Sequence, residues 1–75
     1  MKKAAFLIEL EDVLQRDEPC KADDVLKEYE EWDSLSKMAV MAFFDKHFNV
    51  KFSLGEMDRF NTVNDLIAKA GGAIS

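Results

Sequence analysis

The fold is decided by residues 33–48, which read DSLSKMAVMAFFDKHF. Apolar side chains recur in this stretch at intervals of three and four residues, the spacing of one face of a helix. Asp33 and Ser34 are residue types that favour the N-cap position. We therefore predict a helix from Ser34 to about Phe48 that packs on more than one side, because its apolar face is broad. The apolar positions are Leu35, Met38, Val40, Met41, Ala42, Phe43, Phe44 and Phe48.

Three further helices are expected along the chain. The first covers residues 3–15, where an apolar side is formed by Phe6, Leu10, Val13 and Leu14. A short helix over residues 53–59 opens with Ser53 and Glu56, which have the spacing of a capping box. The last covers residues 62–70 and can end at Gly71. Its apolar stripe consists of Val63, Leu66, Ile67 and Ala70.

The connections between these helices differ in length. Residues 17–33 are predicted as a long loop, with a short turn near Val25 and Leu26, and loops of that length are often functional. Residues 48–52 alternate like a strand, but no second strand is available to pair with them, so we expect an extended connector. The predicted fold is all-α: a small antiparallel four-helix bundle, with three main helices, a short third helix and a long loop between helices 1 and 2.

Size and composition predict one folded domain spanning residues 1–75. The chain is 48% hydrophobic, more than a disordered chain usually contains. An apolar run near the N-terminus starts like a signal peptide, but Glu9 and Glu11 interrupt it early. We therefore expect a cytoplasmic monomer that does not insert into a membrane. Cys20 has no partner for an internal disulfide, and we interpret it as a spare thiol beside Pro19 in the loop.

Acidic residues are concentrated in the long loop. The net charge is −5, which disfavours nucleic acid as a partner because phosphates would be repelled. Within residues 17–33, Lys21 and Lys27 are the only basic side chains. Such a field suits the steering of basic partner enzymes. The acidic residues of this loop are Asp17, Glu18, Asp23, Asp24, Glu28, Glu30, Glu31 and Asp33.

Ser34 is the candidate site of chemistry. At the start of a helix it would present an exposed hydroxyl beside unpaired backbone N–H groups, which tolerate an attached phosphate well. The only histidine, His47, would lie roughly four helical turns away. A serine without a nearby base is a poor hydrolytic nucleophile, so it is better interpreted as a place where another enzyme attaches a group.

The chain resembles the acyl carrier protein family over nearly its whole length. The resemblance rests on Asp33-Ser34-Leu35 at the start of the second helix, on the order of the four helices, and on the segment Phe60-Asn61-Thr62-Val63 before the last helix. It implies that a phosphopantetheinyl transferase attaches 4′-phosphopantetheine to Ser34, between Asp33 and Leu35. The terminal thiol of that arm would carry acyl groups as thioesters and present them to acyl-loading and acyl-transferring enzymes with basic docking surfaces. The chain itself would not be an enzyme.

The resemblance also implies candidate residues for the cargo. Members of the family can hold an acyl chain among their helices, and the positions expected to line that space are Phe44, Phe52, Met57 and Phe60. Their bulky rings could instead fill the space, which would favour a short or polar cargo held outside.

Departures from the family suggest a specialised carrier. Ser36 and Ala39 stand where acidic residues are common, and Lys46 and His47 replace part of an acidic run. Trp32 precedes the motif where a small residue is more usual. Because partner choice depends on such charges, we expect a dedicated carrier for a lipid or secondary-metabolite pathway, working beside a general fatty-acid carrier.

Other functions remain open from the sequence. The cargo could be peptidyl or aminoacyl, since the attachment chemistry would be the same, or the chain could be an unmodified acidic interaction module. A calcium loop is the third alternative, although Val50 stands where glycine is needed and His47 where an oxygen ligand is expected. Its twelve-residue pattern would use Asp45, His47, Asn49, Lys51, Ser53 and Glu56.

Overall fold

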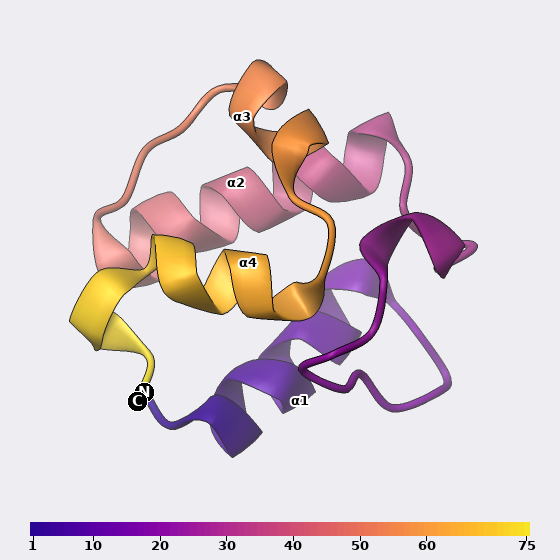
Figure 1. Cartoon of the computed structure of the whole chain (residues 1–75), viewed down its shortest axis with the longest axis horizontal. Helices are drawn as coiled ribbons and strands as arrows, with labels where there is room; N and C mark the ends of the chain where they lie inside the picture. The colour runs from indigo at the N-terminus through magenta and orange to yellow at the C-terminus, as the bar shows by residue number, and fades with distance from the viewer.

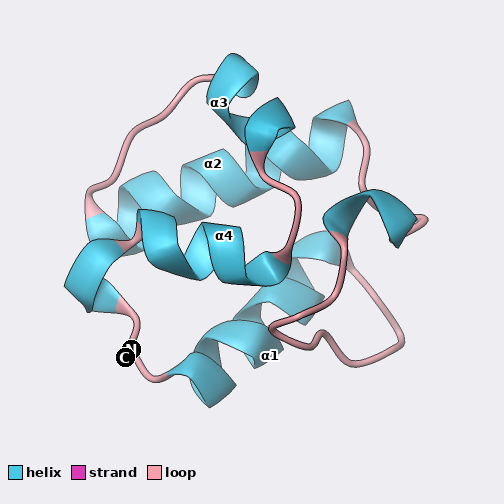
Figure 2. Cartoon of the chain, viewed as in Figure 1, coloured by secondary structure: helices cyan, strands magenta, loops and turns pink.

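The computed structural model describes all 75 residues and contains four α-helices joined by loops (Figure 1). Helix α1 spans Lys3–Leu14, α2 spans Ser34–Phe48, α3 spans Leu54–Arg59 and α4 spans Val63–Lys69. Two short 3₁₀ turns, η1 at Leu26–Glu28 and η2 at Gly71–Ala73, complete the helical segments (Figure 2). The predicted all-α class and the order of the helices are therefore confirmed.

Local chemistry explains where the helices begin and end. The Asp33 carboxylate accepts a hydrogen bond from Ser36 N–H at the start of α2, and Ser53 Oγ accepts one from Glu56 N–H at the start of α3. At their C-termini, α1 and α2 are closed by Gln15 and Asn49, whose φ angles of 57° and 55° place them in the left-handed region. Such residues give the backbone a sharp stop after the last helical turn.

The core draws side chains from all four α-helices and from η1, and it consists of hydrophobic residues. No polar or charged residue is fully buried. Phe6 of α1 packs its ring against Phe44 of α2 at a centroid distance of 5.9 Å, with the planes at 89°. Burial of such aromatic and aliphatic side chains is the main stabilising contribution in a chain this small. The most deeply buried side chains are Phe6, Leu10, Leu26, Val40, Phe44, Met57, Val63 and Leu66.

Helix α2 packs on one side and not on more than one, which corrects the sequence prediction. Leu35 is 79% exposed and Met38 is 56% exposed, and Ala42 is exposed as well. These three residues lie on the face opposite Val40 and Phe44, which are buried. Helix α2 contacts α1 and α3, and those neighbours leave Leu35, Met38 and Ala42 exposed.

The long loop is pinned to the start of α4. Leu26 N–H donates to the Asn61 carbonyl (2.9 Å) and Val63 N–H donates to the Asp24 carbonyl (3.0 Å), around an isolated bridge between Val25 and Thr62. The short turn expected near Val25 and Leu26 is present as η1. These bonds satisfy backbone polar groups at the contact between the loop and α4, so residues 24–26 of the loop have a defined position.

The two chain ends meet beside η2, as the adjacent N and C marks in Figure 1 show. Ser75 N–H donates to the Met1 carbonyl (2.9 Å), and Lys3 N–H donates to the Ser75 carbonyl (3.0 Å). No helix combines the length and the apolar character that crossing a bilayer requires.

Candidate functional site

Ser34 is the first residue of α2 and is exposed, as the sequence predicts. Asp33 before it is the N-cap: its backbone is extended, and its carboxylate accepts the Ser36 N–H at 2.8 Å. The other side-chain hydrogen bond at this helix start is donated by Ser36 Oγ to the Glu31 carbonyl. Both of these hydrogen bonds therefore use neighbours of Ser34, and its hydroxyl stands free at the positive end of the helix dipole.

The pKa of Asp33 is lowered, chiefly by the hydrogen bond from the backbone N–H of Ser36. A carboxyl group with a lowered pKa in the folded state stabilises the fold at pH values above its ordinary pKa, and this contribution is lost as the pH falls through the lowered pKa. We expect Asp33→Asn to remove that part of the pH dependence, because asparagine also caps helices but does not titrate.

Urea unfolding of both proteins from neutral to acidic pH measures this effect. The wild type should lose stability relative to Asp33→Asn as Asp33 becomes protonated. A difference between the two proteins that stays constant over the whole pH range would contradict the assigned role of the Asp33 carboxylate.

The segment leading into Ser34 is held by Arg16, two residues after the end of α1. The Arg16 side chain is only 10% exposed and its Nη1 donates to Glu31 Oε1 at 2.9 Å. The guanidinium also lies 3.8 Å from the centre of the Tyr29 ring, in a cation–π arrangement. Tyr29 in turn donates its hydroxyl to the Asp24 carboxylate at 2.7 Å. This network fixes the loop immediately before Asp33, and sequence reasoning missed it because its members are scattered along the chain.

Beside Ser34, the surface of α2 exposes apolar side chains, and the positive charge of Lys37 is paired with a carboxylate. Lys37 Nζ lies 2.9 Å from an Asp58 carboxylate oxygen, so its charge is paired with α3. The same amine lies 6.0 Å from the Trp32 ring centre. Leu35 and Met38 project from the exposed face of the first two turns. The candidate site thus joins a free hydroxyl to an exposed apolar patch, with the acidic loop alongside.

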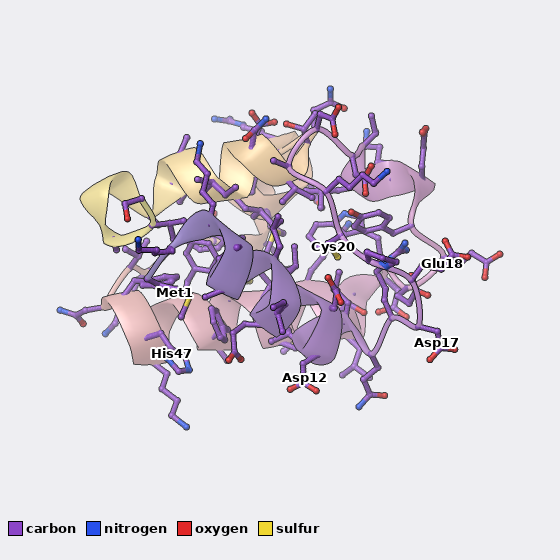
Figure 3. The ribbon with its side chains drawn as sticks, turned by 90° about the horizontal axis from the view of Figure 1, so that it is seen from below. Met1, Asp12, Asp17, Glu18, Cys20 and His47 are labelled. Carbon is purple, nitrogen blue, oxygen red and sulfur yellow. The ribbon has the colours of Figure 1, made fainter.

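Cys20 and His47, the other side chains considered for chemistry, lie well apart from each other (Figure 3). Cys20 is in the loop, as predicted, but its side chain is in the core, with 4% exposure, and burial raises the pKa of its thiol. It is therefore a packing residue rather than a loose loop thiol. His47 is exposed near the C-terminus of α2, with its ring 4.3 Å from that of Phe43. Figure 3 shows it at the opposite end of the molecule from Asp17 and Glu18.

The four candidate cargo-lining residues are brought together. Phe44 and Met57 are fully buried, and Phe52 and Phe60 are half-buried against the core. Phe52 lies 5.5 Å from Phe44 and 5.6 Å from Phe60 between ring centres. A surface hollow of about 790 Å³ lies elsewhere, beneath the long loop, and its lining is mostly charged.

The stretch with the calcium-loop pattern does not form one loop. Its first residues, Asp45 and His47, are inside α2, and Ser53 caps α3. The Glu56 carboxylate is bonded to Lys69 Nζ at 2.8 Å. This contact also corrects the expected capping box, because Glu56 reaches α4 rather than the backbone of Ser53.

Comparisons with known proteins add no relative from which a function could be transferred. No family model, no curated protein and no solved structure matches the chain.

Proposed function

We propose that this protein is a carrier that holds acyl groups as thioesters on a 4′-phosphopantetheine arm attached to Ser34. The observation that carries the proposal is the free, exposed Ser34 hydroxyl at the first residue of a fifteen-residue helix, directly after a capping aspartate. A transferase would bond this oxygen to the phosphate of the arm by breaking the pyrophosphate link of coenzyme A. The leaving group would be 3′,5′-adenosine bisphosphate, and a base of the transferase would take the hydroxyl proton. The helix N-terminus favours the phosphodiester because its N–H groups and dipole attract negative charge.

The rest of the fold suits a carrier that catalyses nothing itself. The arm must be presented from a fixed base, and the Arg16–Glu31–Tyr29 network supplies one just before Ser34. We propose that the helices form an antiparallel bundle that serves to present the arm. Catalytic groups would come from the partner enzymes. His47, the only histidine, lies near the other end of α2 from Ser34 and so is not placed to act as its base.

The partners in this proposal are a phosphopantetheinyl transferase and the enzymes that load and remove the acyl group. Their basic surfaces would be attracted by the acidic loop, and a small apolar contact to Leu35 and Met38 would complete a weak, reversible interface. Since α2 is nearly neutral, partners that rely on an acidic second helix would bind poorly. We therefore propose a specialised cytoplasmic carrier, acting as a monomer, rather than a general fatty-acid carrier.

The test is the intact mass of the protein after incubation with coenzyme A and a broad-specificity phosphopantetheinyl transferase. We expect a gain of one phosphopantetheine group, located by peptide mapping to the peptide that contains Ser34. If folded protein gains no mass with this transferase or with that of its own organism, the carrier proposal is wrong. An unmodified module that binds a basic partner through the acidic loop would then be the better explanation.

A further inference from the structure

Aromatic rings fill the interior between α2, α3 and the connector that joins them. A continuous series runs from Phe6 of α1 through Phe44 of α2 to Phe52 of the connector and Phe60 after α3. Successive centroid distances are 5.9, 5.5 and 5.6 Å. The interplanar angles are 89°, 89° and 71°, close to the edge-to-face geometry that aromatic pairs prefer. Protein interiors packed in this way leave no room for an added chain without displacing their side chains.

The outer side of this series is covered as well. Lys69 of α4 places its amine 5.7 Å from the centre of the Phe52 ring and 2.8 Å from the Glu56 carboxylate of α3. Met57, on the same short helix, is fully buried. A chain entering between α2 and α3 would have to move Phe52, and with it the Lys69–Glu56 contact that links α3 to α4.

From this packing we infer that the cargo is a short or polar acyl group displayed outside the helices, and not a long alkyl chain held within them. The inference rests on the proposed carrier function and names its class of cargo. A long alkyl chain that found no interior space would remain in water, at a cost that rises with each methylene. A short or polar acyl group incurs little of that cost, so the fold can present it openly to partner enzymes.

The experiment compares acetyl, octanoyl and dodecanoyl thioesters of the phosphopantetheinylated protein by NMR. We expect chemical shift changes near Ser34 that are the same for all three, and unchanged signals from Phe52, Met57 and Phe60. Interior shifts that grow with chain length would overturn the inference. The matched control is Phe52→Ala, which opens the ring series and should allow length-dependent shifts at Met57 and Phe60.

A second experiment tests the cargo inference without relying on enzymatic attachment of the arm. Ser34→Cys can be alkylated with iodoacetamides bearing short or long alkyl chains, while Cys20 is protected by its burial. Shifts at Met57 that increase with alkyl length would overturn the cargo inference even if no transferase modifies Ser34. Absence of such shifts supports the inference that the interior takes up no alkyl chain, whereas failure of enzymatic modification would overturn the carrier function on which the inference rests.

Discussion

Ser34→Ala is expected to abolish the gain of phosphopantetheine mass completely, because it removes the oxygen that would bond to phosphorus. The substitution should leave the fold intact. Ser34 is exposed, and the side-chain hydrogen bonds at this helix start are made by Asp33 and Ser36. Alanine is also the best helix former. The free energy of unfolding should therefore change by no more than about 0.5 kcal/mol, the usual range for surface substitutions.

Ser36→Ala is the matched control for this prediction. Ser36 lies one residue beyond Leu35 at the same helix start, and its hydroxyl donates to the Glu31 carbonyl. The variant should still gain the full mass, with a cost in stability of roughly 1 kcal/mol for the lost hydrogen bond. Intact mass and urea unfolding of the three proteins separate attachment from folding. Full modification of Ser34→Ala, or loss of modification only in Ser36→Ala, would place the attachment point elsewhere.

The sequence predicts the helices well because the forces that start and stop them are local. Asp33 and Ser53 cap the helices at which they were expected, since a side-chain oxygen needs only the N–H groups of the next turn. The apolar stripe of the last helix is likewise readable from spacing, and Val63, Leu66 and Ile67 are all buried. The exposed position of Ser34 follows from the same local rules.

Contacts between distant residues account for what could not be predicted. Glu56 was expected to complete a capping box with the backbone N–H of Ser53. Its carboxylate instead accepts a hydrogen bond from Lys69 of α4. In the sequence, Arg16 is a charged residue followed by two acidic residues. Only the fold shows that it forms an ion pair with Glu31 and a cation–π contact with Tyr29. Long-range pairings of this kind have no signature in spacing or composition.

The most informative wrong prediction is that α2 packs on more than one side. Periodicity identifies apolar residues on a helix, but it does not say how many neighbours exist to cover them. Here the buried side is set by Val40 and Phe44, and Met38 on the other side remains more than half exposed. Apolar residues left exposed beside a candidate attachment site fit an interface more readily than a core.

Phe44→Ala is expected to destabilise the protein by about 3–5 kcal/mol, the range for removing a buried aromatic side chain. Phe44 is fully buried, and its ring centre lies 5.2 Å from Phe48 and 5.5 Å from Phe52 as well as close to Phe6. A chain of this length has a free energy of unfolding on the order of 4–11 kcal/mol. The variant should therefore lose at least about a quarter of that stability, with a much lower urea midpoint.

Met38→Ala, on the exposed face of the same helix, provides the comparison for Phe44→Ala. If Met38 were a core residue, as its spacing suggested, its truncation would cost about 2–5 kcal/mol. At 56% exposure it should cost no more than about 0.5 kcal/mol. Urea unfolding of the two variants measures both values, and similar losses for Met38→Ala and Phe44→Ala would contradict the one-sided packing of α2. A near-neutral Met38→Ala that nevertheless slows acyl transfer by a partner enzyme would place Met38 in the interface, because its side chain would then matter for docking and not for folding.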